Sequence, residues 1–517
     1  MKFTKNAAGR MIPDEIEGRK LRPFMGAFAD SGGGYRAAPP IPVSKPDTNK
    51  VLKSLREAIK ASGLKNGMTI SFHHHLRNGD YVVNMVLDQI AKMGFKDINL
   101  FPTALFPVHK PIIEHIKNGV IRNIQGSMNG PVGNFVSHGG LPTLAVLRTH
   151  GGRVRAVEDG DVHIDVAFIA APTADDYGNA NGVDGPSACG PLAYSAIDWQ
   201  YADKVVLITD NLVKYPLIPY SVPSTHVDFI VKVDQIGDPN LIVSGTTRIT
   251  RSPTRLKIAE IAAQFISESP YFRDGFSFQT GAGGISLAIT NILAGIMKKE
   301  GVKARFINGG VTKFAVKMLH DGLIDVLYDG QVFDTDAIYS FKHDLYHAET
   351  PMTMYANYHS KGCLVNRQDI GFLGATEIDV DFNVNVNTHS DGLLLHGIGG
   401  HTDVAAGAKL AMMVVPSFRN RIPIIRDEVT TITTPGETVD VVVCEKGIAI
   451  NPLRKDLIEH FKNSDLPIRD IHDLKNEIEE ITGIPEKPKL KDRIIALIEY
   501  RDGTILDVVR QVDEPMQ

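Results

Sequence analysis

Three adjacent histidines, His73, His74 and His75, stand out because imidazoles bind metals, act as bases or hydrogen-bond anions. They occur in TISFHHHLRNGD, where a β-branched and aromatic run is followed by turn residues. Successive side chains on extended backbone point to opposite faces, so the three rings are not expected to converge on one ion. The sequence holds no HExxH motif and no nearby cysteine that would complete a metal site. We predict no metal here, and either a loop that contacts substrate or a loop without chemistry.

The residues around the histidines predict the elements that hold them. The following segment, YVVNMVLDQIAKMG, repeats apolar residues at helical spacing and closes on Gly94. The histidines are therefore expected on a strand-to-helix loop. Open α/β sheets bind ligands at the carboxyl ends of their strands, which is where this loop would lie.

A second candidate site lies in FQTGAGG, where Gln279 precedes Gly281, Gly283 and Gly284. Glycines allow backbone to approach a ligand closely, and the helix that follows presents free N–H groups to anions. The spacing matches neither the dinucleotide fingerprint nor a P-loop. Either a bound ligand or a tight packing turn explains the pattern.

A further glycine run, GIGGHTDVAAGA, contains Gly399 and Gly400 and opens another expected helix. His401 follows directly and is either a base or a residue that begins the helix. Two glycine-rich turns in one part of the chain favour a backbone-lined pocket for a thioester or a phosphate.

Arginines supply candidate anion ligands. Arg248, Arg251 and Arg255 surround a proline that is expected to begin a helix, and guanidinium groups bind carboxylates and phosphates with two hydrogen bonds. Arg248 is the one that we favour for the site. Arg153 and Arg155 flank a hairpin-like stretch and are expected at the surface.

Composition limits the class of protein. The chain has 517 residues, 43% of them hydrophobic and 22% charged, which fits a globular α/β chain of more than one domain. Its net charge of −5 argues against non-specific nucleic-acid binding. Cys189, Cys363 and Cys444 form neither a disulfide framework nor a zinc ribbon, and Cys189 lacks a recognisable base partner for a nucleophile. Without a leader or a long apolar run, we expect a cytoplasmic protein outside the membrane.

From Val51 onward, strands and helices alternate, which predicts largely parallel sheets flanked by helices. The order of strand, glycine turn and helix in GFSFQTGAGGISLAITNILAGIMKKEG repeats the order around the histidines. We therefore predict an α/β fold of two similar domains, residues 50–250 and 251–517. Residues 1–49 are rich in Pro, Gly and charge and are expected to form an amino-terminal arm without a core.

Four segments, HIDVAFIAAPTADDYGNAN, FQTGAGG, TEIDVDFNVNV and GIGGHTDVAAGA, resemble the coenzyme A transferase superfamily in that order. Within it, MTISFHHHLRNGDYVVNMVLDQIAKMGFK and GFSFQTGAGGISLA resemble the alpha chains of bacterial citrate lyases. The resemblance runs from about Val51 to Val512. It implies two CoA-transferase-type domains and a transferase that exchanges acetate for citrate on the thiol of an acyl carrier protein.

The resemblance also implies partners. These are a gamma subunit that carries a CoA-like prosthetic group of the phosphoribosyl dephospho-CoA type, a beta subunit that cleaves the citryl thioester, and further copies of this chain. The chain itself is expected to bind no cofactor. Two alternatives stay open: a free-CoA transferase or acyl-CoA hydrolase that forms a glutamyl thioester, and a scaffold chain without catalysis.

The resemblance assigns site residues as well. It implies that Gly399 and Gly400 stabilise an oxyanion through backbone N–H, that Asn385 lies in the pocket, and that the three histidines bind citrate. Relatives that use free CoA carry a nucleophilic glutamate, and Lys317 stands at that position in AVKMLHDG. A lysine cannot replace it. Glu377 is either a positioning group or a nucleophile, and our hypothesis is direct attack by a citrate carboxylate, giving a mixed anhydride.

Overall fold

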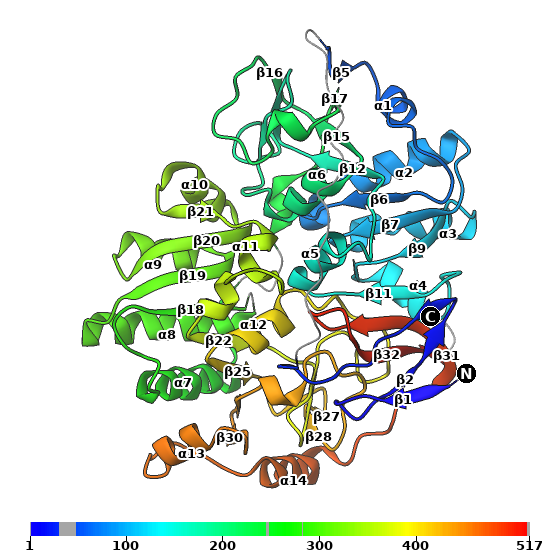
Figure 1. The fold of residues 1–517 in the computed structure, drawn as a ribbon. Coiled ribbons are helices and arrows are strands. Elements are labelled where there is room, and N and C mark those ends of the chain that lie inside the picture. The colour runs from blue at the N-terminus through cyan, green and yellow to red at the C-terminus, as the bar shows by residue number, and fades with distance from the viewer. Residues whose placement is uncertain (1, 30–47, 244–247, 282, 514–517) are drawn as a thin grey trace.

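Two large sheets form the frame of the computed structural model, which describes residues 2–29, 48–243, 248–281 and 283–513 (Figure 1). All seven strands of the first sheet are parallel. The eight strands of the second are parallel except for the last pair. This confirms the predicted α/β class with largely parallel sheets. In sheet order the strands are β5 (Val51–Leu52), β17 (Phe229–Lys232), β15 (Lys204–Thr209), β12 (Val166–Ala170), β6 (Thr69–Phe72), β7 (Ile98–Pro102) and β9 (Ile121–Ile124), then β21 (His347–Glu349), β20 (Ile324–Val332), β19 (Ala304–Val311), β18 (Phe276–Thr280), β22 (Ile370–Leu373), β25 (Leu410–Val414), β29 (Val441–Cys444) and β30 (Gly447–Ile450).

Helices cover these sheets, and their apolar residues follow the helical period. In α2 the buried positions are Val82, Val83, Val86, Leu87 and Ile90, which lie on one face. Among the described residues, no helix is both long and apolar enough to cross a bilayer. The helices are α1 (Leu55–Ala61), α2 (Val82–Lys92), α3 (Ile112–Lys117), α4 (Pro131–Ser137), α5 (His150–Glu158), α6 (Ala196–Tyr201), α7 (Pro253–Glu268), α8 (Gly284–Glu300), α9 (Lys313–His320), α10 (Thr335–His343), α11 (Met352–Ala356), α12 (His401–Gly407), α13 (Lys455–Phe461) and α14 (Ile471–Thr482).

The two sheets share one topology. In the first, β6 is followed on one side by β7 and β9 and on the other by β12, β15 and β17; in the second, β18 is followed by β19 and β20 and by β22, β25 and β29. The part of the chain built on the seven-stranded sheet is called the first half, and the part built on the eight-stranded sheet the second half. Each half also carries a small sheet in which one strand pairs antiparallel with the next and parallel with a later one. The small sheets contain β13 (Thr173–Asp175), β14 (Ala180–Asn181) and β16 (Leu212–Val213), and β23 (Glu377–Asp379), β24 (Val384–Asn385) and β28 (Ile425–Arg426).

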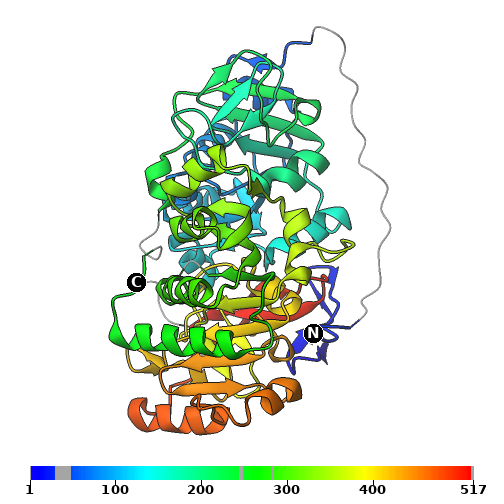
Figure 2. The ribbon, with the colours of Figure 1, turned by 90° about the vertical axis from the view of Figure 1, so that its left-hand side faces the viewer.

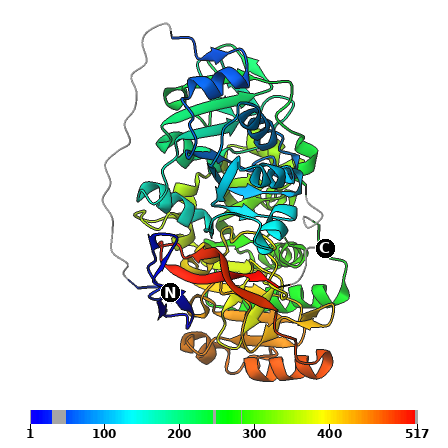
Figure 3. The same ribbon diagram turned by 90° about the vertical axis from the view of Figure 1, so that its right-hand side faces the viewer.

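The amino-terminal residues do not behave as the sequence predicted. Residues 2–29 pack against the carboxy-terminal hairpin of β31 (Leu490–Glu499) and β32 (Ile505–Val512), beside which they lie in Figures 1 and 3. Phe24 N donates to Ile505 O at 3.0 Å, and the side chains of Ile12 and Phe24 are fully buried. The expectation of an arm without a core is therefore wrong for residues 2–29, while residues 30–47 lie outside the described residues. The strands of this segment are β1 (Phe3–Lys5), β2 (Met11–Pro13), β3 (Glu15–Ile16) and β4 (Arg19–Lys20).

The same hairpin joins the two halves, which are stacked in Figure 2. Strand β31 pairs in parallel with β11 (Ala145–Leu147), so the end of the chain completes a sheet that begins in the first half. The limits of 250 and 251 for the domains stay a prediction. Four short strands complete the list: β8 (Ala104–Leu105), β10 (Ser127–Met128), β26 (Phe418–Arg419) and β27 (Ile422–Pro423).

Helix α5 overturns the surface position expected for Arg153 and Arg155, which are both buried. Arg153 pairs with Asp198 at 2.6 Å. Arg155 pairs with Glu499 of the carboxy-terminal hairpin at 2.9 Å. The stretch HGGRVRAVEDGD is helical because Thr149 caps it, its hydroxyl accepting from Gly152 N, and the arginines face carboxylates that are distant in sequence.

Candidate functional site

A cavity of about 920 Å³ lies at the carboxyl ends of the strands of the second sheet. His150 and Tyr194 of the first half also line it, so both halves contribute to its wall. This is the edge at which a parallel α/β sheet is expected to bind a ligand. The strand-end residues that line it are Gln279 and Thr280 of β18, Gly309 and Gly310 of β19, Gly330 of β20, Leu373 of β22 and Val414 of β25.

The charges of the cavity are all of one sign. Among the described residues that line it, four are arginines and none is Asp, Glu or Lys. Arg419 reaches the cavity from β26, and partial burial together with the nearby Arg255 lowers its pKa. The arginines are Arg248, Arg251, Arg255 and Arg419. A cavity with unneutralised guanidinium groups fits an anionic ligand.

The first glycine turn lines the cavity, since Gln279, Gly281, Gly283 and Gly284 are all in its wall, and ligand binding by this turn stays a prediction. Gly283 caps α8, whose first residues line the cavity, so the N-terminal end of a 17-residue helix is available to an anion. A side chain at Gly284 would crowd the arginine segment, because a Cβ there would lie 3.0 Å from Arg248 O, and Thr250 N donates to Gly284 O at 3.2 Å. The turn thereby holds the arginine segment against the helix.

The second glycine turn also reaches the cavity, through Gly400. The N–H of Gly400 has no hydrogen-bond partner in the described part of the chain. A Cβ at this position would lie 2.2 Å from Tyr355 Oη, so only glycine fits. Gly399 adopts a left-handed φ of 62°, and its carbonyl accepts from His150 N at 2.9 Å, which ties α5 to the turn.

The three histidines lie behind the cavity wall and are not among its lining residues. The ring of His74 packs on Tyr194, with centroids 4.3 Å apart, and His75 Nε2 accepts from Tyr194 N at 3.2 Å. His73 Nε2 accepts from Ala170 N at 3.0 Å, and burial lowers the pKa of His73 to about 4. The rings therefore support Tyr194, which does line the cavity.

Asn385 and Glu377 also lie outside the lining, in a closed polar network. Asn385 Nδ2 donates to Glu377 Oε2 at 2.9 Å, and Asn385 Oδ1 accepts from Thr388 N at 3.1 Å. Glu377 accepts from Thr430 N at 2.7 Å and pairs with Arg426. Both side chains are fully buried, with their polar atoms bonded to protein. The geometry fits the positioning role weighed for Glu377 and does not place Asn385 in the pocket.

Three other candidates have structural explanations. His401 lines the cavity, but its Nε2 faces Gly374 O at 3.0 Å and so carries the proton, while burial lowers its pKa to about 4. Burial raises the pKa of Cys189, which disfavours a thiolate. Lys317 lies exposed on α9, paired with Asp321 at 2.9 Å, so it does not stand at a catalytic position.

Among the lining residues that sequence reasoning missed are His150, Tyr194, Tyr355 and Arg419. They come from α5, the turn before α6, α11 and β26, and no local motif marks them. Tyr194 Oη lies 3.1 Å from His150 Nε2, and burial, with Arg153 nearby, lowers the pKa of His150 to about 3. The signal that could have found them is the repeated order of strands and helices, because it brings these segments to the carboxyl edge of the sheet.

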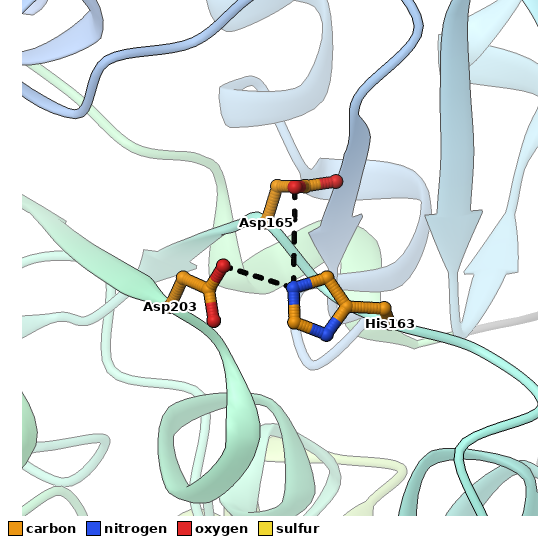
Figure 4. A group of neighbouring side chains, drawn as sticks. All are labelled: His163, Asp165 and Asp203. Atoms are coloured by element: carbon orange, nitrogen blue, oxygen red, sulfur yellow. Dashed lines mark hydrogen bonds and ion pairs between the residues drawn. The ribbon is translucent and has the colours of Figure 1, made fainter. Parts of the chain in front are cut away.

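In the described part of the chain, one group of His and Asp side chains lies close enough together to share a metal ion (Figure 4). His163 Nε2 is 2.9 Å from Asp203 Oδ2 and 4.0 Å from Asp165 Oδ1. Asp165 and Asp203 directly precede β12 and β15, at the amino edge of the first sheet. Asp165 Oδ2 also accepts from Thr69 N at 2.7 Å, so the group joins strand beginnings.

The fold is of the coenzyme A transferase type, and its cavity is lined by four arginines. Among the solved structures with this fold is a 4-hydroxybutyrate CoA-transferase from Porphyromonas gingivalis, 17% identical with a TM-score of 0.55, where the match covers 84% of this chain and 97% of that chain. Another is a Pseudomonas malonate decarboxylase, 18% identical with a TM-score of 0.61, where the match covers 84% of this chain and 86% of that chain. At these identities the likeness concerns the fold alone.

The family model for the citrate lyase alpha subunit matches residues 48–512, and the chain belongs to this family. The citrate lyase alpha chain of Klebsiella pneumoniae is 46% identical over 464 residues, 90% of this chain and 91% of that protein. A putative alpha subunit of citrate lyase from Streptococcus mutans, solved in complex with citrate, is 48% identical with a TM-score of 0.95, covering 98% of this chain and 100% of that chain. The chain is thus a transferase-type enzyme subunit, as the sequence predicted.

Proposed function

We propose that this chain moves the thiol of an acyl carrier protein from acetate to citrate, converting acetyl carrier and citrate into citryl carrier and acetate. The observation that carries the proposal is the cavity itself, which presents four guanidinium groups and, among its described lining residues, no carboxylate. A tricarboxylate neutralises such a cavity, whereas a neutral acid would not. The citrate complex of the Streptococcus mutans relative supports the same substrate.

In this proposal, the arginines and the N-terminus of α8 bind different carboxylates of citrate. Arg255 and Arg419 lie close enough for one to lower the pKa of the other, and a carboxylate between them would relieve that repulsion. The backbone of Arg248 lies beside Gly284 and both residues line the cavity, so we expect a second carboxylate to bind between the Arg248 side chain and the N-terminus of α8.

The reaction proceeds by direct attack in this proposal. A citrate carboxylate oxygen adds to the acetyl carbonyl carbon, the C=O π pair moves to oxygen, and collapse breaks the C–S bond and releases the carrier thiolate. The thiolate then adds to the citryl carbonyl of the mixed anhydride and expels acetate. The described lining residues include no Asp, Glu or Cys that would act as a covalent nucleophile, which supports direct attack over a glutamyl thioester.

The partners follow from the proposal. The thioester arrives on the CoA-like prosthetic group of a gamma subunit, a beta subunit cleaves the citryl thioester, and the chain associates with itself. Three free, buried cysteines suit a reducing cytoplasm. The chain supplies no resident cofactor, and transfer is expected to survive EDTA.

The test is to incubate the purified chain with acetylated carrier protein and radiolabelled citrate. Label on the carrier, without added CoA, supports the proposal. Free acetyl-CoA as a sufficient donor would instead support a free-CoA transferase of the same fold, and absence of any transfer would support a scaffold. Recovery of transfer only after a divalent ion is added back to EDTA-treated chain would contradict the metal-free mechanism.

A further inference from the structure

Tyr355 places a hydroxyl group inside the cavity. The residue belongs to α11, is 2% exposed and lines the cavity. Its ring lies at 6.5 Å from that of His150, so it closes the cavity on the side where the two halves meet. It belongs to none of the glycine turns or arginine segments described above.

Gln279 fixes the position of this hydroxyl. Gln279 Nε2 donates to Tyr355 Oη at 2.9 Å, and Tyr355 Oη donates to Gln279 Oε1 at 3.1 Å. The missing side chain of Gly309 in β19 leaves room for this amide, because a Cβ there would lie 2.7 Å from Gln279 Nε2. The phenol O–H reaches a ligand in the cavity by turning away from Oε1, while Nε2 still donates to the phenol oxygen and holds it in place.

The hydroxyl also lies against the second glycine turn. A Cβ on Gly400 would be 2.2 Å from Tyr355 Oη, so the backbone of Gly400 and the phenol group are direct neighbours. The N–H of Gly400 has no partner among the described residues. The Tyr355 hydroxyl is therefore adjacent to a backbone residue with an unpaired N–H, in a cavity that both residues line.

We propose that Tyr355 is a catalytic residue whose O–H, together with the N–H of Gly400, binds the carbonyl oxygen of the acetyl thioester as it becomes an oxyanion. This role rests on the proposed function. As the citrate carboxylate bonds to the carbonyl carbon, the π pair moves to the oxygen between the two donors. Both donors keep their protons, and the pair returns to re-form the carbonyl when the C–S bond breaks.

The surroundings suit a donor and not a base. Burial raises the pKa of Tyr355, and Asp403 nearby raises it further, so the phenol stays protonated at neutral pH. A neutral donor whose oxygen is already held in place stabilises developing charge with little reorganisation, which is the property that an oxyanion site requires.

The test is Tyr355→Phe, which keeps the ring and removes the donor. Single-turnover transfer from acetyl carrier to labelled citrate is expected to slow about 100- to 1000-fold. The concentration of citrate that gives half the maximal rate is expected to change by less than about threefold, since the lost bond forms only in the transition state. The matched control is Tyr358→Phe, three residues later and outside the cavity lining, which is expected to transfer at the wild-type rate.

The outcomes separate the two proposals. An active wild type with an equally active Tyr355→Phe variant overturns the role of Tyr355 and leaves the proposed function standing. A variant that loses citrate affinity in proportion to its rate overturns it too, because the hydroxyl would then bind the ground state. A wild type that transfers no label from carrier to citrate overturns the proposed function and the role of Tyr355 together.

Discussion

Arg419 has to carry its charge beside Arg255, in a cavity whose described lining includes no carboxylate. We expect Arg419→Leu to raise the KM for citrate about 10- to 100-fold, because a hydrogen bond to a charged group contributes about 1.5 to 3 kcal/mol. The value of kcat should stay within about threefold, since Arg419 would hold citrate in both ground and transition states. Steady-state transfer kinetics with varied citrate measure both constants.

The matched control is Arg305→Leu, which removes an exposed guanidinium from β19 outside the cavity lining. It should leave both constants unchanged. An Arg419→Leu variant with an unchanged KM and a much lower kcat would contradict a binding role and assign this arginine to the transition state.

For Asn385 we expect a substitution to change stability and not the kinetics of transfer. Its Oδ1 accepts from Asn387 N at 3.0 Å and from Thr388 N at 3.1 Å, and the side chain is completely buried. Asn385→Ala is therefore expected to lower the free energy of unfolding by about 1 to 3 kcal/mol, because buried groups lose their partners. Transfer by the folded fraction should persist. Urea unfolding, followed by circular dichroism, measures the change.

The first half supplies the matched comparison. Asn181 occupies the same place in its small sheet, and its Oδ1 accepts from Val183 N at 3.2 Å and Asp184 N at 3.3 Å. Asn181→Ala should destabilise the chain to a similar extent. If Asn385→Ala kept normal stability and lost turnover, the pocket role implied by resemblance would be restored.

Asn385 and Asn181 also show which site residues could be predicted from the sequence. The glycines near Gln279 lie within one strand-turn-helix unit, so their position follows from neighbouring residues alone. Asn385 shares its local turn with Asn181, and a motif match cannot tell a repeated fold feature from a binding residue. Tyr355 and Arg419 reach the cavity only through tertiary packing, which no local pattern encodes.

At the scale of elements, local order was predictable and distant pairing was not. Strand β18 and helix α8 follow from a short apolar run, a glycine turn and a long amphipathic stretch. The first strands escaped prediction because they pack on a hairpin nearly 500 residues away, and a composition rich in Pro and Gly gave no sign of it. The bonds from Asn6 Nδ2 to Ile505 O and Leu506 O show how far apart the partners are.

Phe24 tests whether the amino-terminal segment is part of the core. Its ring is 1% exposed and packs edge-on against Tyr500, with centroids 4.8 Å apart. Phe24→Ala should lower the free energy of unfolding by about 3 to 5 kcal/mol, as expected for removal of a buried aromatic ring. Phe28 is 71% exposed, so Phe28→Ala should change it by less than about 0.5 kcal/mol. If urea unfolding showed equal changes in the free energy of unfolding for both substitutions, the segment would be a loosely attached arm and not part of the core.

At the scale of the molecule, a buried ion network holds the end of the chain to the first half. Glu499 of β31 accepts from Arg148 Nε at 2.7 Å and from Arg155 at 2.9 Å, and Arg19 of the amino-terminal segment lies 3.1 Å away. Because α5 carries both Arg155 and the cavity residue His150, this network also supports one wall of the cavity. The halves are therefore expected to unfold together.

Glu499→Gln tests that expectation. The substitution removes the carboxylate partner of the buried Arg148, while Arg155 keeps Asp159 and Asp161, and breaking a buried ion pair typically costs about 3 to 5 kcal/mol. We expect a loss of this size in the free energy of unfolding at pH 7, with a single transition that intrinsic fluorescence and circular dichroism report alike. Glu114→Gln, which removes an exposed pair with Lys117, should change the free energy by less than about 0.5 kcal/mol.

The dependence on pH gives the network a second signature. Burial alone would raise the pKa of Glu499, but the charges of Arg148 and Arg155 outweigh it and lower the pKa to about 2. A carboxyl whose pKa is lower in the folded than in the unfolded chain stabilises the fold fully above its unfolded pKa, near 4.5, and loses that contribution as pH falls toward 2. The difference in the free energy of unfolding between wild type and Glu499→Gln should therefore be constant from pH 7 to about 5. This gap should narrow as the solution becomes more acidic. A gap that stays equally wide at pH 3 would show that the variant is destabilised by lost packing, and that the ion network does not join the two halves.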